Sequence, residues 1–257
     1  MKPTLLALSY FQKAAEKQHL TKVAEELHIS QPSLSRTIKT LETDLGAQQT
    51  TVSFSLFAAS KLIPGFLMEF RRLHPNIHLE ILQQKIDHEK KKGDGVDLSL
   101  FSSINPMEND YCTTLMEEEI LLAMPDTDPH AGDAAVKLKD FAESGFILLQ
   151  TGKSLRAITD VYCHAAGFTP RISLESDSPD TVREFIRAGL GISFVPKITW
   201  HGVSSSHVKL VPISTPICRR SIILSWRADI EDSPSAVLLR NYMIDNFARY
   251  AYGQAEK

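Results

Sequence analysis

Apolar side chains recur at helical spacing in the first 46 residues, and this pattern predicts three short helices. The first helix is expected to span residues 4–17. The second opens at Leu20-Thr21, with Thr21 as its N-cap. A turn at His28-Ile29 separates it from the third helix, which ends at Gly46.

The third helix is predicted to be amphipathic. Ser30 is expected to cap it, and Pro32 falls in its first turn, where a missing N–H costs nothing. Its apolar stripe consists of Leu34, Ile38, Leu41 and Leu45. The opposite side is polar and consists of Pro32, Arg36, Lys39 and Thr43, flanked by Ser33 and Ser35.

The remainder of the chain alternates between strand-like and helical patterns. Strands are expected at 51–57, 77–82, 95–100, 146–150, 170–174, 192–195 and 221–226. Helices are expected at 60–73, 85–92, 154–166 and 180–188, and a last helix follows Ser233 as N-cap and Pro234, ending near Tyr250. Pro64-Gly65 should break the first of these helices near its start. The β-α-β order predicts a mostly parallel, doubly wound sheet in two subdomains.

Composition adds few constraints. The chain has 257 residues and a formal net charge of −3, so its overall charge does not favour binding to nucleic acid or to a membrane surface. Three widely spaced cysteines suit free thiols in a reducing cytosol. The apolar run at 5–11 is short and is followed at once by charged residues, unlike a signal peptide. These features predict a cytoplasmic protein that spans no membrane.

Two short helices joined by a tight turn are typical of a helix-turn-helix. A glutamine near the start of the second can contact adenine edges, and an arginine can contact guanine O6 and N7. Serine and lysine can hold phosphates. From periodicity alone, the same residues fit a three-helix cap whose polar face merely meets solvent.

The segment LTKVAEELHISQPSLSRTIKTLETDLG, residues 20–46, resembles the DNA-binding motif of LysR-type transcriptional regulators. The matching positions are Ala24, Ser30-Gln31-Pro32, Leu34-Ser35-Arg36, Ile38, Leu41-Glu42 and Leu45-Gly46. The resemblance implies base and phosphate contacts from Gln31, Ser35 and Arg36. The full expected DNA-binding set is Thr21, Gln31, Pro32, Ser33, Ser35, Arg36 and Lys39.

The later stretches FRRLHPNIHLEI, GVDLSL and SDSPDTVREFIRAGLGISFVP resemble the effector-binding domain of the same family. The resemblance implies an all-α helix-turn-helix N-terminus followed by an α/β, two-subdomain effector domain of periplasmic-binding-protein type. The expected domains are 1–46 for the truncated helix-turn-helix, 47–50 for a residual linker and 51–257 for the effector domain. Subdomain one takes about 51–122 and 224–257, and subdomain two about 123–223.

Ligands of open α/β sheets bind beyond the carboxyl ends of the strands, where helix N-termini favour anions. The family's effector pocket is built from the same loops. Ser60, Ser102 and Thr151 are expected to donate hydrogen bonds to a carboxylate or similar group, and Phe57 and Val195 to form apolar wall. The expected effector-binding set is Phe57, Ser60, Ser102, Thr151, Gly152, Val195 and Pro196. Serine and threonine in such loops also serve simply as N-caps.

Enzyme chemistry is poorly supported. Thr151-Gly152-Lys153-Ser154 lies between a strand and a helix, as a P-loop does, but Ile147 stands where the first glycine is required. No cysteine has zinc-ligand spacing, and His74 and His78 straddle Pro75. We therefore expect no enzyme activity, no metal and no cofactor.

The family pattern stops at Gly46 and resumes near residue 51, where family members carry a wing and a long dimerisation helix. The sequence therefore predicts an internal deletion. The leading hypothesis is a DNA-binding transcriptional regulator that responds to a small, anionic metabolite and forms homo-oligomers through the effector domain. The alternative is a cytoplasmic metabolite-binding module, or inactive regulator remnant, that does not bind DNA.

Overall fold

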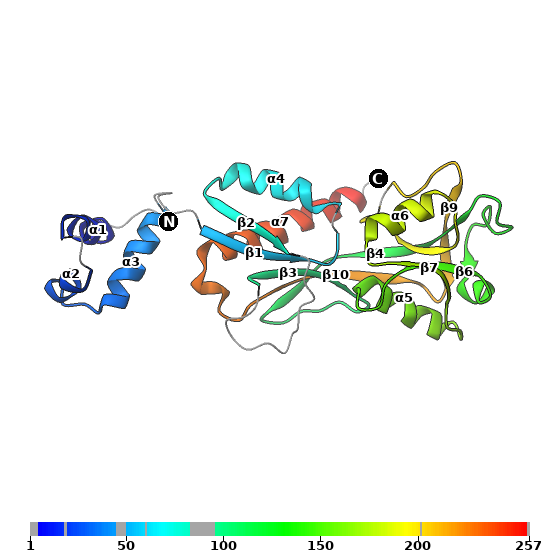
Figure 1. Cartoon of the computed structure of the whole chain (residues 1–257), viewed down its shortest axis with the longest axis horizontal. Coiled ribbons are helices and arrows are strands. Elements are labelled where there is room, and N and C mark those ends of the chain that lie inside the picture. The colour runs from blue at the N-terminus through cyan, green and yellow to red at the C-terminus, as the bar shows by residue number, and fades with distance from the viewer. Residues whose placement is uncertain are drawn as a thin grey trace. The chain divides into compact units, whose positions relative to one another are not determined.

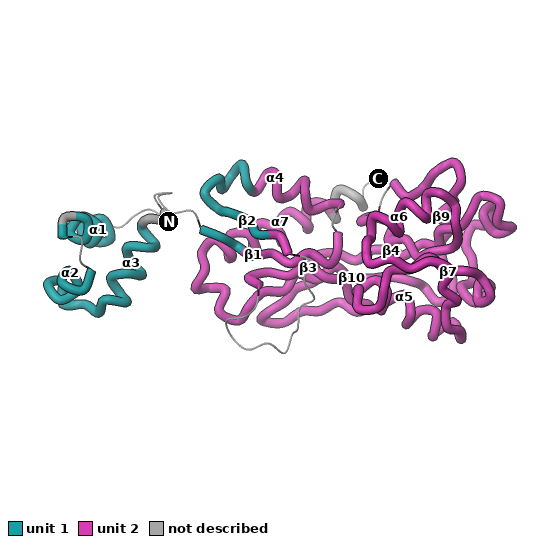
Figure 2. Tube along the Cα trace, in the orientation of Figure 1, with its two compact units in different colours: residues 1–52, 71–80 teal, residues 53–70, 81–257 magenta. Residues whose placement is uncertain are grey.

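The computed structural model describes residues 5–17, 20–44, 50–59, 61–82, 96–200 and 202–255 (Figure 1). The chain divides into two compact units, one of residues 1–52 with 71–80 and one of residues 53–70 with 81–257 (Figure 2). The boundary passes through two strands and a helix rather than through a linker. The predicted joint at 47–50 is only partly described, and its last residue, Thr50, already begins a strand.

The first unit begins with the three predicted helices, α1 (Leu5–Lys17), α2 (Leu20–Glu26) and α3 (Gln31–Asp44). Their shared core is small. Val23 and Ala24 of α2 pack with Leu34 and Ile38 of α3, and Leu41 is 1% exposed. Leu45 and Gly46, predicted to end the apolar stripe and the helix, lie outside the described residues.

The larger of the two sheets is mixed and has eight strands. The strand order is β2-β1-β3-β10-β4-β9-β5, and β8 also pairs with β4. The strands are β1 (Thr50–Leu56), β2 (Ile77–Leu82), β3 (Leu98–Ser103), β4 (Cys112–Pro125), β5 (Val136–Lys137), β8 (Ser193–Pro196), β9 (Val208–Thr215) and β10 (Arg219–Trp226). A second, two-stranded parallel sheet consists of β6 (Gly145–Leu149) and β7 (Arg171–Ser176).

Helices follow the strands in the order that the sequence predicts. They are α4 (Ile63–Leu73), α5 (Ser154–Ala165), α6 (Pro179–Arg187) and α7 (Pro234–Ala255), with short 3-10 turns at Leu138–Phe141 and Ile230–Asp232. Ser178 caps α6 through a hydrogen bond from the Thr181 N–H, and Pro179 follows as its first residue. Phe66 and Phe70 of α4 contact Phe247 and Tyr242 of α7, respectively.

The prediction of a mostly parallel sheet is wrong. β10 runs antiparallel to both β3 and β4, and β4 runs antiparallel to β8 and β9. The error has a clear cause, since the sequence predicts neither the 14-residue β4 nor β9. β4 pairs with β10 over residues 112–119 and with β8 and β9 over residues 120–125, so this one strand joins two groups of strands into a single sheet.

Several predicted boundaries move. α4 begins at Ile63, so Pro64-Gly65 falls in its first turn, where proline is tolerated, and breaks nothing. β3 begins at Leu98 and includes Ser102 and Ser103, which were expected in a loop. Pro196 is the last residue of β8, opposite Ile120, so the strand ends at the proline. α7 continues to Ala255 rather than ending near Tyr250. The helix expected at 85–92 lies outside the described residues.

A cluster of buried apolar side chains forms a core within residues 120–218. It draws Ile120 and Leu122 from β4, Phe146 from β6 and Phe194 from β8, and the Phe146 and Phe194 rings stack with centroids 5.8 Å apart. Within the described ranges, no helix is both long and apolar enough to cross a membrane.

Candidate functional site

The polar face of α3 is the first candidate site. The helix begins as predicted, since the Ser33 N–H donates to the Ser30 hydroxyl at 3.3 Å and the Leu34 N–H to the Ser30 carbonyl at 3.1 Å. Leu34, Ile38 and Leu41 are buried, which turns the opposite side outward. The exposed residues there are Gln31, Pro32, Ser33, Arg36 and Lys39, and Ser35 is half-buried.

The turn before α3 has a geometry that the sequence did not reveal. His28 has a φ of 55°, in the left-handed region where glycine is usual. The Ile29 N–H donates to the Ala24 carbonyl at 3.0 Å, and the His28 N–H donates to the Glu25 carbonyl at 3.1 Å. This pair of bonds is a Schellman motif, which ends α2 and aims the chain into α3. His28 therefore sets the angle at which α3 leaves the turn.

Thr21 does not cap α2. The helix includes Leu20, so Thr21 lies one residue inside it, with an exposed side chain. The seven predicted DNA-binding residues therefore have exposed or half-buried side chains, and six of them lie on α3. A helix face that presents glutamine, serine, arginine and lysine can donate hydrogen bonds to base edges and phosphates.

A buried ion pair forms the second candidate site. Arg220 of β10 faces Glu118 of β4 across the antiparallel ladder, and the Arg220 Nε donates to Glu118 Oε1 at 2.9 Å. The two residues are 2% and 3% exposed. Each is in phase with apolar neighbours on its strand, Ile120 and Leu122 for Glu118 and Ile222 and Leu224 for Arg220, so both point into the interior.

Residues 198–199, which follow β8, donate hydrogen bonds to the Glu118 carboxylate. The N–H groups of Ile198 and Thr199 donate to Glu118 Oε2 at 2.8 and 2.9 Å, and the Thr199 hydroxyl donates to Oε1 at 2.7 Å. The Arg220 Nη2 also bonds the Thr199 hydroxyl. Glu118 thus accepts four hydrogen bonds, which offsets the cost of removing its charge from water.

The same network extends to two serines from different elements. The Arg220 Nη1 donates to the Ser102 hydroxyl of β3 at 3.4 Å. The Ser102 hydroxyl lies 2.9 Å from that of Ser154, the first residue of α5. Tyr162 anchors α5 to β10, because its hydroxyl donates to the Arg219 carbonyl at 2.7 Å and accepts from the Arg219 N–H at 2.9 Å. Ser154, at the N-terminal end of α5, is therefore connected to Arg220 through Ser102, and Tyr162 fixes the other end of the helix to β10.

The electrostatics of this network are nearly balanced. Burial lowers the pKa of Arg220, and the neighbouring Glu118 carboxylate opposes that shift. The pair as a whole carries no net charge. A ligand at the serines would meet hydroxyl groups and the N-terminus of α5, whose N-cap Lys153 makes no side-chain capping bond. Such surroundings favour a partner that accepts hydrogen bonds.

The structure brings together few of the predicted effector-binding residues. Ser102 belongs to the network described above. Thr151 and Gly152 are exposed in the turn before α5, and Phe57 is half-buried after β1. Val195 and Pro196 are buried within β8, and Val195 belongs to the apolar core. Ser60 lies outside the described residues, and the helix that it was expected to open begins three residues later.

The sequence prediction missed Glu118, Ser154, Thr199 and Arg220 as site residues. A signal existed for two of them. Glu118 and Arg220 are charged residues at positions where the two-residue period of a strand places apolar ones. Ser154 had been placed only at the start of a helix, and nothing local distinguishes Thr199.

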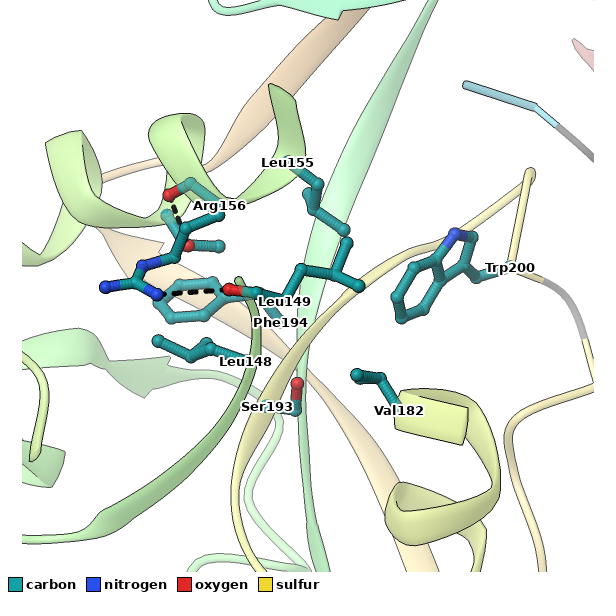
Figure 3. A pocket seen from close by; sticks show the side chains of 9 residues that line it. Leu148, Leu149, Leu155, Arg156, Val182, Ser193, Phe194 and Trp200 are labelled. Carbon is teal, nitrogen blue, oxygen red and sulfur yellow. Dashed lines mark hydrogen bonds between the residues drawn. The ribbon is translucent and has the colours of Figure 1, made fainter. Parts of the chain in front are cut away.

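A small void is lined by residues of β6, α5, α6 and β8, together with Trp200 (Figure 3). Its volume is about 10 Å³, roughly what one water molecule requires. Arg156 and Trp200 lie on opposite sides of it, and the Arg156 Nη1 donates to the Leu149 carbonyl at 3.1 Å. None of the predicted effector-binding residues lines this void, which is a packing gap rather than a ligand pocket.

A larger groove of about 450 Å³ lies along α5 and β7. Its lining residues are Arg156, Asp160, Val161, His164, Phe168, Thr169, Pro170 and Ile172. Val161 and Ile172 are 51% and 39% exposed, so the groove is an apolar surface feature. Within the described segments no cluster of three or more His, Cys, Asp or Glu side chains could hold a metal ion.

Two family models match the chain. The model described as "Bacterial regulatory helix-turn-helix protein, lysR family" matches residues 5–50, and the "LysR substrate binding domain" matches residues 44–248. The two ranges overlap at residues 44–50. The chain therefore has no residues between the two matched regions.

A relative shows how much sequence is absent. The uncharacterized HTH-type transcriptional regulator YybE of Bacillus subtilis (strain 168) is 28% identical over 288 residues, which cover 94% of this chain and 98% of YybE. Since 94% of 257 residues is about 242, about 46 aligned positions have no residue in this chain. The difference is internal, because both chains are covered nearly from end to end.

Solved structures share the fold. The regulatory domain of Synechocystis PCC6803 CcmR in complex with 2-PG has a TM-score of 0.66 at 18% identity, over 77% of this chain and 98% of that one. The effector binding domain of QuiR in complex with shikimate has a TM-score of 0.62 at 17% identity, over 79% and 99%. Both resemble the α/β part of this chain.

Proposed function

The chain belongs to the LysR family of transcriptional regulators, and from that premise we propose that it binds promoter DNA through α3 and a small anionic effector beside Ser102 and Ser154. The effector controls the regulator's action on its promoter. As a regulator of bacterial type, it acts in the cytoplasm, where the DNA lies.

The observation that supports DNA binding is the outward display of six polar or proline residues on α3, above a buried stripe. We assign base contacts to Gln31 and Arg36 and phosphate contacts to Ser33, Ser35 and Lys39. Pro32 and Thr21 border this face. The assignment places the base-contacting side chains in the first two turns of the recognition helix, where helix-turn-helix proteins contact base edges.

The observation that supports an effector site is the Ser102–Ser154 contact beside a buried guanidinium. These residues come from β3, α5 and β10, which the expected division assigns to both subdomains. CcmR and QuiR carry 2-PG and shikimate in their solved complexes, and the same fold here supports a small-molecule effector. We propose that the effector carries an anionic group, because hydroxyl groups and the N-terminus of α5, which has no side-chain cap, face the site.

The short joint favours a second function. With about 46 positions absent, we place the deletion after Gly46, where the wing and the dimerisation helix of the family are expected. A lone helix-turn-helix makes few phosphate contacts, whereas pairing two half-sites multiplies affinity. The alternative function is therefore an effector-binding module that no longer binds DNA.

We propose that copies associate through the effector domain. Two surfaces combine an edge strand with exposed apolar side chains, one on α5 and β7 with Val161 and Ile172, and one on α4 and β2 with Met68 and Ile81. Sedimentation of Val161→Asp should show a shift toward monomer. The matched control is Lys209→Asp, on an exposed position of β9, which should leave the assembly unchanged.

Electrophoretic shift and footprinting on the DNA upstream of its coding region test the proposed function. At low salt, wild type should protect a discrete site, and the double variant Gln31→Ala, Arg36→Ala should not. If wild type protects nothing, or if the double variant represses a reporter as well as wild type does, the module without DNA binding is the correct assignment. Effector binding is measured separately, so the two proposals fail independently.

A further inference from the structure

The Glu118 carboxylate lies where β4 passes from one group of strands to the other. Up to Glu119 the strand pairs with β10, and from Ile120 onward it pairs with β8 and β9. The chain leaves β8 at this point, and the Lys197 N–H donates to the Glu119 carbonyl at 3.0 Å. The next two N–H groups donate to the side chain of Glu118 instead of to the β4 backbone.

A short turn at residues 196–200 is capped by this carboxylate. The Trp200 N–H donates to the Pro196 carbonyl at 3.1 Å, while Glu118 accepts from the Ile198 and Thr199 N–H groups. An acidic side chain caps the first turn of a helix in the same way. Thr199 is fully buried, and its hydroxyl bonds both Glu118 and Arg220. The turn is therefore fixed to β4 and to β10 together.

The last residue of the turn contacts α6. The Arg183 guanidinium lies over the Trp200 ring, 5.1 Å from its centroid, and Arg183 is 3% exposed. Its Nη2 bonds Asp180, but its Nη1 is buried and bonds none of the residues that the structure describes. A buried donor without an acceptor costs free energy. The turn thus connects a fully bonded group, Glu118, to an incompletely bonded one, Arg183.

We infer that Glu118 is a latch that holds the two groups of strands at one angle, and that the effector domain changes shape when the carboxylate releases Ile198 and Thr199. Because the turn continues directly from β8, its release lets β8 and its neighbours tilt about β4 between residues 119 and 120. The inference rests on the proposed function only in that an effector drives the release. The latch itself can be measured without effector or DNA.

The contacts around the turn make both states accessible. After release, Glu118 keeps its bond to the Arg220 Nε, so the buried charges remain paired. Trp200 also borders the small void, so its ring is not tightly packed on every side (Figure 3). A shift of that ring lets the Arg183 Nη1 reach an acceptor, which offsets part of the free energy lost at Glu118.

Amide hydrogen exchange, detected by NMR on the full-length protein, tests the latch. Thr199→Val keeps the shape of the side chain but removes the hydroxyl that bonds Glu118 and Arg220. The Ile198 and Thr199 amides should exchange about tenfold faster, which corresponds to about one lost hydrogen bond. The Lys197 amide should accelerate by the same factor, because one opening step exposes all three. The amides within β8 should not change.

A distance measurement tests whether release changes the shape of the domain. Spin labels at Asp245→Cys of α7 and Lys209→Cys of β9 occupy exposed positions beside the two groups of strands, and the native cysteines are buried. The latched domain should give one distance by electron resonance. Glu118→Gln loses the charge that attracts four donors, so it should add a second distance.

Two matched variants serve as controls. Thr199→Ser restores the hydroxyl and should return the exchange rates to those of wild type. Lys197→Ala removes the exposed ion pair with Glu119 from the same turn, and it should change neither the exchange rates nor the label distance. Thermal melts establish that each variant is folded.

Either of two results overturns the inference. If Ile198 and Thr199 accelerate in Thr199→Val while Lys197 does not, the carboxylate is only a local cap. If folded Glu118→Gln keeps the single distance of the latched domain, release does not change the shape. Should Glu118→Gln fail to fold, the Lys197 amide in Thr199→Val decides alone. Since no measurement uses DNA or an effector, the latch and the proposed function fail independently.

Discussion

The α3 face and the Glu118–Arg220 network use similar residue types under opposite conditions. The predicted DNA-binding residues of α3 lie within nine positions of one another and are mostly exposed. Water and salt therefore screen their charges while no DNA is bound. Arg220 and its partner Ser102 lie 118 residues apart in sequence, and the guanidinium is enclosed. A charge at the surface can serve recognition at little cost to stability, whereas a buried charge destabilises the fold unless it is paired and hydrogen-bonded.

The largest expected effect is on the buried pair. Glu118→Ala leaves the Arg220 guanidinium uncompensated, and the free energy of unfolding should fall by about 3–5 kcal/mol. Denaturant titration measures the loss.

Glu119→Ala is the matched control for Glu118→Ala. Its carboxylate pairs with Lys197 at 3.2 Å at the surface, so its removal should cost about 0–1 kcal/mol. If Glu118→Ala and Glu119→Ala lower the free energy of unfolding equally, burial does not determine how much each carboxylate contributes to stability.

The second expected effect is on DNA binding. Arg36→Ala should weaken binding by about 1–3 kcal/mol and relax preference at one base position. Lys39→Ala should weaken binding evenly across sequences and flatten the salt dependence. Titrations of specific and random duplexes at several salt concentrations separate the two.

These two α3 variants should also leave stability almost unchanged, within about 0.5 kcal/mol, because neither side chain is buried. Equal loss of affinity on specific and random DNA in both variants would show that Arg36 contacts a phosphate rather than a base.

The two regions also differ in how far the sequence predicted them. The apolar stripe of α3, the Ser30 cap and the exposed face follow from spacing within one helix, and the structure confirms them as far as Leu41. The central antiparallel pairing does not follow, because nothing near Arg220 indicates that β10 inserts between β3 and β4. Glu118 and Arg220 gave a signal only as charges in phase with apolar residues, and Ser154 and Thr199 gave none.

The third expected effect concerns the local backbone. His28→Gly places the residue that best tolerates a positive φ at the turn before α3, and it should stabilise the helix-turn-helix unit by about 1 kcal/mol. Thermal unfolding detected by circular dichroism would report it. His28→Val should destabilise the unit, since a β-branched side chain disfavours this conformation. A melting temperature lowered by His28→Gly would show that the imidazole makes a stabilising contact of its own.

The smallest expected effect lies on an exposed ion pair of the effector domain. His130 Nδ1 contacts Asp133 Oδ2 at 2.8 Å, and this hydrogen bond raises the pKa of His130 above 6.5. The contribution to stability is therefore full below about pH 6.5 and is lost as the pH rises through the higher folded-state pKa. Proton NMR of His130 in wild type and Asp133→Asn measures the shift.

Asp133→Asn should return the His130 titration toward lower pH while leaving the unfolding midpoint nearly unchanged at every pH. A large change in stability would mean that exposure does not distinguish this pair from Glu118–Arg220.

The position of β10 between β3 and β4 also governs the order of events during synthesis. β3 and β4 leave the ribosome early, but the strand that joins them is complete only at Trp226, near the end of the chain. Until then both strands have an unpaired edge, which can pair with other chains. The three N-terminal helices contact one another locally and depend on no such closure. A ribosome stalled before residue 219 would therefore carry folded helices and an aggregation-prone, open sheet.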